Sequence, residues 1–551
     1  MTSEKQNIPE LKVIVNPLDR VLIARKGDIL LNILREAGIR MESLCGGKGS
    51  CGKCRVILES GKVEEIGSKL EDHLTIEERN MGYSLACRIK LQGDTVFTIP
   101  SESRIQNPNI LVSNLYSEQK KPLIPPDMSR LGVAIDVGTT TIVGQLIDRD
   151  HQSLISSTST LNRQITYGEG LLTRINYAKT PDGLSRIQRA VVDSINEVIN
   201  YLIEKSEAPI ENISYVSIGG NPVMLYLLNG INPVPLEDPY VKVSRKPIRR
   251  KAGELGFNVP PTAQVYCLPN VSRFVGGDAV GDIISSGLYK SDQVSLLIDL
   301  GTNGEIIIGN KNWLISTSCA SGPAFEGEGI RHGMRASKGS IDHIEVNKDT
   351  HIAKYSVIGE TKPRGLCGSG IIDLVYELYQ TGLMDFVGKF VASSSQFIRE
   401  GKWGLEYLVV AMEDSDIGRD IVLTQSDLDY FMDSKAAVCG SVTVLMNKMH
   451  LKVNDIRHVY LAGAFSNFSK IDNVTKVGII PEFPNADYHC IGNGSLSGAY
   501  LTLISNEKKV EAEEIAEKMV YFDLLLDSSF MDEYSKALYI PGAREYFPGS
   551  Y

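Results

Sequence analysis

The chain has 551 residues, a length that predicts about three to four domains at roughly 150 residues each. Hydrophobic residues make up 42% and charged residues 23%, which excludes a disordered chain, collagen and a coiled coil. The net charge of −10 argues against a partner that is nucleic acid or an anionic membrane, since both need a basic surface. No targeting segment and no apolar run long enough to span a membrane is found, so we expect a cytoplasmic protein.

The nine cysteines are unevenly distributed. Four of them lie in the first 90 residues, and the other five are single residues along the rest of the chain. Residues 1–100 carry 15 basic and 14 acidic side chains, whereas the remainder has a net charge of −11. Two kinds of domain therefore share the chain. The pattern assigns no role to the five single thiols, which are Cys267, Cys319, Cys367, Cys439 and Cys490.

The N-terminal part has the pattern of a small mixed α/β domain. Residues 11–27 alternate as a β-hairpin, and residues 29–37 have helical spacing, with Asp28 as the predicted N-cap and Gly38 as the end. A cysteine-rich loop follows, then an expected strand at 55–58 and a last segment at 85–99 in which Cys87 lies on a strand. The predicted order is hairpin, helix, cysteine loop and strands.

The cysteine spacing of this loop is C-x5-C-x2-C, with a distant fourth cysteine. Plant-type ferredoxins use C-x4-C-x2-C and a distant cysteine, and the extra residue resembles the adrenodoxin-type variant. Glycines at 46, 47, 49 and 52 suit a loop that brings backbone N–H groups close to sulfur. We therefore predict a 2Fe–2S cluster; a zinc knuckle and incidental thiols are the alternatives. The predicted ligands are Cys45, Cys51, Cys54 and Cys87.

Two absences from the sequence restrict the role of this cluster. No strand–GxGxxG–helix fingerprint occurs, which argues against a built-in NAD or flavin module, and no second four-cysteine set occurs. Electrons are therefore expected from an external donor such as a ferredoxin or flavodoxin. The proline-containing segment 101–130 is a predicted linker that lets the N-terminal domain move. The predicted division is 1–100 (ferredoxin-like domain), 101–130 (linker), 131–208 (middle region, first part of the actin-like unit) and 209–551 (C-terminal ATPase domain).

Three glycine-rich turns follow apolar strands beyond residue 130. The first two share one pattern, Asp136-Val-Gly138-Thr139 and Asp299-Leu-Gly301-Thr302, and the third is Ala462-Gly463-Ala464-Phe465. A Gly-Thr turn offers backbone N–H groups and hydroxyls to phosphate oxygens, and an Asp at the strand end can hold magnesium through water or orient an attacking water. A facing pair would bind the β- and γ-phosphates, and the third turn would cover the adenosine. Structural hairpins are the alternative.

This pattern predicts a site for ATP with Mg²⁺. The candidate catalytic residues are Asp136, Asp299 and Glu305, although either aspartate could simply cap its turn and Glu305 could be structural. The candidate nucleotide-binding residues are Gly138, Thr139, Thr140, Gly301, Thr302, Asn303, Ser321, Gly322, Gly463, Ala464 and Phe465.

The three turns resemble the phosphate 1, phosphate 2 and adenosine motifs of the actin, sugar kinase and heat-shock chaperone superfamily. Segments 219–224, 319–327 and 365–373 resemble one family within it, the ATP-dependent reductive activators of corrinoid proteins, and the resemblance covers essentially the whole chain. It implies an α/β multidomain fold: a β-grasp 2Fe–2S ferredoxin-like domain, a linker, and a two-lobed actin-like (ASKHA, ribonuclease H-like) ATPase unit. One departure is Asn221-Pro222, where related sequences have Asn-Thr.

The resemblance also implies a function. Such an enzyme uses ATP to reduce the inactive Co(II) state of a corrinoid protein to Co(I) by one electron, and so reactivates a methyltransferase or O-demethylase system. A corrinoid protein is then the expected partner, and a homodimer is suggested only by the resemblance. The alternatives are an activator of a radical dehydratase, a metabolite kinase with an appended ferredoxin domain, and a non-catalytic chaperone or scaffold. The N-terminal four-cysteine domain disfavours the activator of a radical dehydratase, because activators of that kind resemble proteins without a ferredoxin domain.

Overall fold

The computed structural model describes residues 10–39, 41, 47, 49, 52–67, 73–100, 103, 130–168, 170–301, 303–391, 395–463 and 470–550. The chain divides into two compact units, Met1–Pro108 with Ile165–Glu169, and Asn109–Gln164 with Gly170–Tyr551. The predicted linker lies outside the described residues apart from Ser103 and Arg130, and the predicted boundary at residue 208 stays a prediction. Within the described ranges, no helix combines the length and the apolar character needed to cross a membrane.

The smaller unit is a five-stranded mixed sheet with the order β2-β1-β5-β3-β4. Its strands are β1 (Glu10–Asn16), β2 (Arg20–Arg25), β3 (Arg55–Glu65), β4 (Tyr83–Leu85) and β5 (Ile89–Thr98). β1 and β2 form the predicted hairpin, and β1 runs parallel to β5. Alternate residues of β1 are buried against the leucines of α1 (Leu30–Glu36), so that one face of the sheet carries the core. This arrangement is the predicted β-grasp fold.

Two local predictions in this unit are wrong. Asp28 does not cap α1, because its carboxylate accepts a hydrogen bond from the Arg25 backbone N–H at 2.8 Å and so closes the turn between β2 and α1 instead. Aspartate side chains compete for nearby backbone donors in this way. Cys87 lies in a 3₁₀ turn, η2 (Ala86–Arg88), and not on a strand, because the chain leaves β4 and enters β5 there. Beside this turn, α2 (Ile76–Asn80) begins with a capping box between Thr75 and Glu78.

The larger unit contains two six-stranded sheets. The first has the order β10-β11-β9-β6-β7-β8 and the second β22-β21-β12-β13-β14-β23. The strands of the first are β6 (Leu131–Val137), β7 (Thr141–Asp148), β8 (Ser153–Leu161), β9 (Ile213–Gly220), β10 (Ile248–Lys251) and β11 (Gln264–Cys267). Those of the second are β12 (Ser295–Leu300), β13 (Gly304–Gly309), β14 (Leu314–Cys319), β21 (His458–Ala462), β22 (Asp487–Gly492) and β23 (Val520–Tyr521).

The two sheets share one topology. Each begins with three antiparallel strands, β6–β8 in the first sheet and β12–β14 in the second. Two later strands then extend each sheet beyond its first strand and run parallel to it: β9 and β11 beside β6, and β21 and β22 beside β12. The strands are largely buried, as expected for sheets covered on both faces. This repeated order is that of the ribonuclease H-like fold and confirms the predicted two-lobed architecture.

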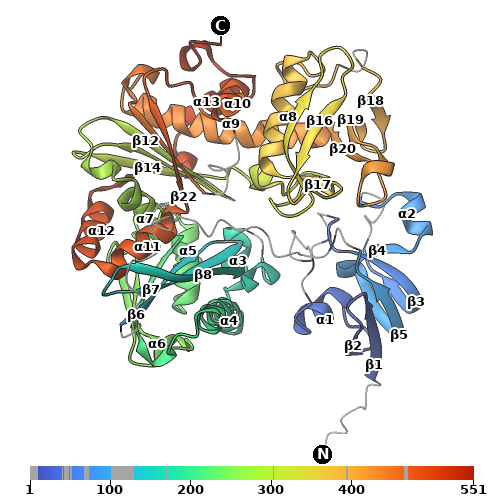
Figure 1. Ribbon diagram of the computed structural model, residues 1–551, viewed down its shortest axis with the longest axis horizontal. Coiled ribbons are helices and arrows are strands. Elements are labelled where there is room, and N and C mark those ends of the chain that lie inside the picture. The colour runs from blue at the N-terminus through green and yellow to red at the C-terminus, as the bar shows by residue number, and fades with distance from the viewer. Residues whose placement is uncertain are drawn as a thin grey trace, which may run out of the picture. The chain divides into compact units, whose positions relative to one another are not determined.

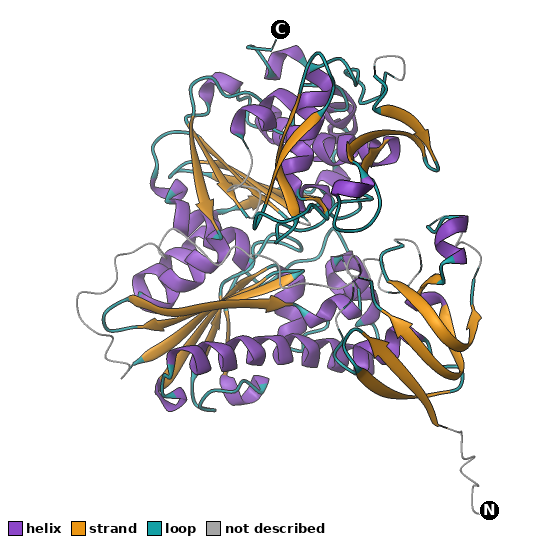
Figure 2. Cartoon of the chain, turned by 45° about the vertical axis from the view of Figure 1, so that its right-hand side comes forward, coloured by secondary structure: helices purple, strands orange, loops and turns teal. Residues whose placement is uncertain are grey.

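Two helices, α7 (Gly277–Ser286) and α11 (Gly494–Ile504), pack against each other and against strands of both sheets (Figure 1). One buried core joins them to Ala134 of the first sheet and Leu297 of the second. The opposite face of the first sheet is covered by α4 (Pro181–Ser206), so helices lie on both of its faces in Figure 2. The C-terminal ends of β6 and β12 lie close to the N-termini of α7 and α11.

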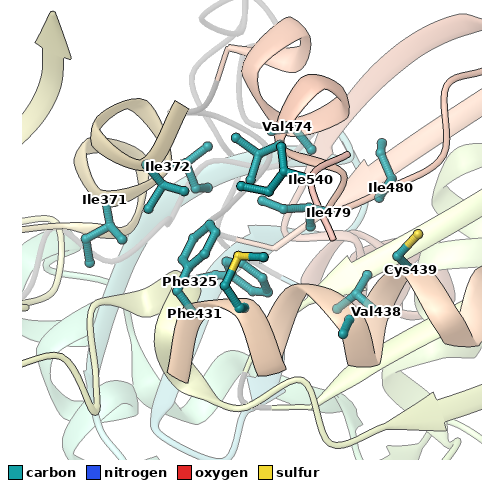
Figure 3. Close-up of a cluster of buried hydrophobic side chains, with 14 of the residues drawn as sticks. Phe325, Ile371, Ile372, Phe431, Val438, Cys439, Val474, Ile479, Ile480 and Ile540 are labelled. Carbon is teal, nitrogen blue, oxygen red and sulfur yellow. The ribbon is translucent and has the colours of Figure 1, made fainter. Parts of the chain in front are cut away.

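A second core fills the lobe of the second sheet. Figure 3 shows Phe431 and Val438 of α9 (Gln425–Lys448) in one buried cluster with Ile371 and Ile372 of α8 (Gly368–Gln380). Phe325 meets Phe431 edge to face, with ring centroids 5.6 Å apart and planes at 81°. This lobe also holds two three-stranded sheets. One has the order β16 (Ala353–Val357), β15 (Ser340–Val346), β17 (Gly365–Leu366), and the other has the order β18 (Ile398–Gly401), β19 (Gly404–Val410), β20 (Ile421–Thr424). The other helices of the larger unit are α3 (Leu171–Tyr177), α5 (Pro222–Leu228), α6 (Ala252–Leu255), α10 (Ile471–Val477), α12 (Asn506–Lys518) and α13 (Ser529–Ala537).

Candidate functional site

Two of the four predicted cluster ligands are brought together by the pairing of β3 with β4. Cys54 comes immediately before β3, Cys87 lies two residues after β4, and the register pairs Arg55 with Leu85. The Ala86 backbone N–H donates to the Cys54 carbonyl at 2.8 Å, and both thiols are buried. Cys45 and Cys51 lie outside the described residues.

The backbone around these thiols fits a cluster. A Cβ atom added to Gly47 would lie 3.9 Å from the Cβ of Cys87 and 3.3 Å from Leu31, so Gly47 itself lies close to Cys87. At Gly52 an added Cβ would lie 2.9 Å from His73, which leaves room only for glycine. Two buried thiols with glycines at 47 and 52 beside them are thiolate donors and a close backbone approach of the kind that an iron–sulfur cluster needs.

Side chains that the sequence pattern did not single out hold the end of this loop. Arg55 binds the Glu78 carboxylate at 2.6 Å, the His73 carbonyl at 2.9 Å and the Gly52 carbonyl at 3.2 Å. The Ser103 hydroxyl accepts from the Arg55 backbone N–H at 3.1 Å and donates to the Lys53 carbonyl at 3.0 Å. The backbone on both sides of Cys54 is therefore fixed from two directions.

In the larger unit, the two Asp-x-Gly-Thr patterns occupy equivalent positions. Asp136 is the penultimate residue of β6 and Asp299 that of β12, and both strands turn back as predicted into β7 and β13. The Gly138 N–H closes the first turn by donating to Thr141 O at 3.0 Å, and the Gly301 N–H closes the second by donating to Asn303 O at 3.1 Å. The duplicated topology thus places one predicted phosphate turn on each sheet.

Asp136 is bound by the N-terminus of α11. Its carboxylate accepts hydrogen bonds from the Ser495 hydroxyl at 2.7 Å and from the Asn493 amide at 2.9 Å. Burial raises the pKa of Asp136, and these two bonds act against that rise. Asn493 also caps α11 by accepting from the Leu496 N–H at 2.8 Å. The first turn and this helix are therefore coupled through one carboxylate.

Two further buried acids, Asp278 and Asp282, come from the first turns of α7. Burial raises the pKa of Asp278 to about 7 and raises that of Asp282 well above its ordinary value, and the negative charges of the other acids add to both effects. Burial likewise raises the pKa of Asp299 to about 7, with the charges of Asp278 and Asp136 as further causes. In the described part of the chain, neither carboxylate oxygen of Asp282 accepts a hydrogen bond. These acids form one desolvated group whose negative charges raise one another's pKa.

A desolvated group of carboxylates fits Mg²⁺ in chemistry, since oxygen is the ligand that Mg²⁺ prefers. Over the described ranges, no three His, Cys, Asp or Glu side chains form a preformed metal site. Because Mg²⁺ keeps several waters and binds through one or two carboxylates plus substrate phosphates, a complete protein cage is not expected for it. The residues present therefore fit a magnesium ion that arrives with a nucleotide.

The remaining predicted site residues surround the second turn. The Ser321 hydroxyl donates to Gly301 O at 3.2 Å, and a Cβ added to Gly322 would lie 2.9 Å from the Tyr430 hydroxyl. Glu305 is buried beside Ser318, which donates to it at 3.3 Å, and burial raises its pKa well above the ordinary value. Asn303 and Gly463 lie at the turns after β12 and β21. Thr302, Ala464 and Phe465 lie outside the described residues.

Four residues of this site were not predicted from the sequence: Asp278, Asp282, Asn493 and Ser495. A usable signal was present, because Gly-Gly-Asp at 276–278 and Gly-Asn-Gly-Ser at 492–495 each begin an otherwise apolar helix. The departure at Asn221-Pro222 also has a structural explanation. Asn221 caps α5 by accepting from the Val223 N–H at 3.1 Å, and Pro222 occupies the first helical position, where proline is favoured.

The fold and the two sites define the class of protein: a ferredoxin-like iron–sulfur domain and an actin-like ATPase unit in one chain. The ATPase unit carries one phosphate turn on each of its two sheets. Residues 13–92 match the 2Fe-2S iron-sulfur cluster binding domain, residues 131–291 the RACo middle region, and residues 293–550 the C-terminal domain of RACo, the ASKHA domain.

Whole-chain relatives agree with these matches. A solved structure of a reductive activator for corrinoid,iron-sulfur protein is 30% identical, with a TM-score of 0.71 over 98% of this chain and 100% of that one. The corrinoid activation enzyme RamQ of Eubacterium limosum is 28% identical over 95% of this chain and 98% of its own. A [Co(II) methylated amine-specific corrinoid protein] reductase of Methanosarcina barkeri is 22% identical over 72% and 74%. The chain belongs to the family of reductive activators of corrinoid proteins, which confirms the predicted family and its two cofactor-binding domains.

Proposed function

We propose that this chain transfers one electron to the inactive Co(II) state of a corrinoid protein, in a reaction that depends on ATP, and so restores Co(I). The observation that carries this proposal is the match to a reductive activator over 98% of the chain, which includes both the cluster domain and the ATPase domain. Relatives named for corrinoid activation and for Co(II) reduction agree with it.

The requirement for ATP follows from the reduction potentials. A plant-type 2Fe–2S cluster supplies single electrons at about −400 mV, a potential above the one that Co(II) reduction demands. Each ~59 mV uphill costs about 1.4 kcal/mol for one electron. A nucleotide can offset that cost only by favouring a state of the complex in which cobalt is easier to reduce, such as one with altered cobalt ligation.

The roles of the chain's own residues follow from their positions. The cluster would be held by Cys45, Cys51, Cys54 and Cys87. The pairing of β3 with β4 brings Cys54 and Cys87 together. The turns after Asp136 and Asp299 would bind the phosphates through their backbone N–H groups and hydroxyls, and the two carboxylates would bind magnesium-bound water or orient the attacking water. Glu305 is the candidate base beside Asp299, its partner across the β12–β13 register.

Three further points belong to this proposal. The electron donor is an external protein such as a ferredoxin or flavodoxin, because the sequence carries one four-cysteine set and no dinucleotide fingerprint. The location is the cytoplasm, where thiol ligands stay reduced. The active species is a homodimer, which only the family resemblance supports.

The proposal is tested by anaerobic spectroscopy of a corrinoid protein in the Co(II) state, mixed with this chain and a low-potential reductant. Absorbance of Co(II) should fall and that of Co(I) should rise only when MgATP is present. An equal fall without ATP would reject the ATP-driven reading. Transfer of phosphate from ATP to a small metabolite, with no change at cobalt, would favour a metabolite kinase instead.

A further inference from the structure

The three consecutive carbonyls of the first phosphate turn are all bound by one segment of the chain. Asn162 donates from its side-chain amide to Gly138 O at 2.9 Å and from its backbone N–H to Thr140 O at 2.9 Å. The Arg174 guanidinium donates to Thr139 O. Throughout the described ranges, the N–H groups of Thr139 and Thr140 donate to no protein acceptor, and both residues are partly exposed.

These donors belong to one buried network. Gln164 Oε1 accepts from Arg174 Nη1 at 3.3 Å and from the Asn162 amide at 3.2 Å, while its own amide donates to Ile187 O at 3.1 Å. The Gln164 backbone N–H donates to Asn162 Oδ1 at 3.1 Å. All three side chains are 0% exposed. A fully buried polar network with mutually satisfied bonds has little freedom to rearrange, so it fixes the turn that it binds.

Arg174 adds charge as well as hydrogen bonds. It lies on α3, and its rigid fork of N–H donors reaches Thr139 O, Gln164 and the Met224 sulfur, the last at 3.1 Å. Its positive charge therefore lies directly behind a turn whose free N–H groups suit an anion. Preorganised donors and a cation in a water-excluded site favour negative charge more strongly than they would in water.

We propose that Asn162, Gln164 and Arg174 are positioning residues for the nucleotide. They hold the carbonyls of the first phosphate turn on its buried side and so leave the N–H groups of Thr139 and Thr140 free for phosphate oxygens. This inference rests on the proposed nucleotide site. It concerns the phosphates, because the contacts of the network in the described residues reach the first turn, which is the predicted phosphate turn.

The test is calorimetric binding of MgATP and of adenosine to the full chain, with wild type, Arg174→Met and Asn162→Ala. Arg186→Met is the matched control, since Arg186 forms an exposed ion pair with Asp182 on α4. Both network variants should weaken ATP binding by about tenfold or more and change adenosine binding less than about twofold, since only the phosphate contacts are disturbed. The control should bind ATP like the wild type. In one further variant, Arg174→Ala, added guanidinium should restore part of the ATP affinity that this variant loses.

The outcomes separate this inference from the proposed function. If the wild type binds no ATP, the proposed function itself fails. If the wild type binds ATP and both variants bind it equally well, the positioning role is overturned. An equal loss of ATP and adenosine affinity would also overturn it, because it indicates a general structural role. If Arg174→Met does not fold, the binding of MgATP and of adenosine is measured instead for Asn162→Ala and for Arg174→Lys, which keeps the positive charge. The same outcomes then support or overturn the positioning role.

Discussion

A Cβ atom added to Gly463 would lie 2.6 Å from Asp299 Oδ1 and 2.7 Å from Leu300 O. Gly463 follows β21, which runs parallel beside β12, and its φ of +79° is one that residues with a side chain rarely adopt. Two motifs that are 163 residues apart in the sequence, the second phosphate turn and the predicted adenosine turn, therefore meet through one glycine and one carboxylate.

The first prediction is that Gly463→Ala disturbs Asp299. The new methyl group must push aside the carboxylate or the backbone of Leu300, and the positive φ adds a backbone strain of about 1–3 kcal/mol. We expect MgATP affinity to fall by about tenfold or more and the free energy of unfolding to drop by that strain. Calorimetric titration and urea unfolding measure the two effects.

Gly287→Ala is the matched control for this change. Gly287 has a similar φ of +73°, but an added Cβ there has no atom within 4 Å. It should lose stability through the same backbone strain and keep wild-type ATP affinity. Equal loss of ATP affinity in both variants would show that the contact with Asp299 does not matter for the nucleotide.

The second prediction concerns the cluster thiols. Cys54→Ser and Cys87→Ser should each abolish the visible absorbance of a 2Fe–2S cluster and the reduction of Co(II), because each removes a thiolate ligand. ATP hydrolysis in the separate ATPase unit should persist. Cys490→Ser, at an exposed cysteine of the larger unit, should leave the cluster spectrum unchanged. A normal cluster spectrum in Cys87→Ser would remove this residue from the ligand set.

The third prediction concerns the two turn aspartates. Asp136→Asn and Asp299→Asn keep the side-chain volume and remove the charge that binds magnesium-bound water, so ATP hydrolysis should fall by about tenfold or more. The cluster absorbance should not change. Asp487→Asn, an exposed residue at the start of β22, serves as the control for phosphate release assays. ATP hydrolysis at the wild-type rate in both variants would show that these aspartates only cap their turns and have no role in catalysis.

The fourth prediction is a dependence of stability on pH. Burial raises the pKa of Asp282 well above 3.8, so the folded chain retains a proton that an unfolded aspartate loses. The unfolded state then binds fewer protons, and the contribution of Asp282 to stability falls as the pH rises from about 4 toward the raised pKa. Asn has no such proton. Without Mg²⁺ and nucleotide, Asp282→Asn should therefore gain stability over the wild type, and by more at pH 8 than at pH 5.

Urea unfolding at those two pH values measures this difference. An advantage of the same size at pH 5 and pH 8 would mean that Asp282 does not retain its proton in the folded chain. A loss of stability at pH 8 would mean that the folded chain stabilises the charged form of Asp282, opposite to the direction expected for a desolvated carboxyl group.

Local repeats of a motif were readable in the sequence, and contacts between distant segments were not. The hairpin at the N-terminus, both Asp-x-Gly-Thr turns and the strand before Gly463 were predicted, because each is a short pattern with its own backbone chemistry. Asp28 was misassigned because its preference for a nearby backbone donor is satisfied equally well by the turn that follows a strand and by the first turn of a helix.

The contributions of α7 and α11 required the fold. Asp282 and Ser495 approach the two turns only because the duplicated sheets bring those helices between them, and no local pattern specifies that approach. The same holds for Arg174, which in sequence is an arginine on a short helix and in the structure is fully buried behind the first turn. Tertiary packing, and not local propensity, makes these residues part of the site.

The central claim is that ATP bound in the larger unit controls electron transfer to cobalt. It is tested most directly by reducing the chain's cluster, removing excess reductant, adding one equivalent of Co(II) corrinoid protein, and following both centres by electron paramagnetic resonance. On addition of MgATP, one Co(II) signal should disappear for each reduced-cluster signal lost, with none lost before addition. A cluster that stays reduced after MgATP is added, or Co(II) that disappears without it, would contradict the account.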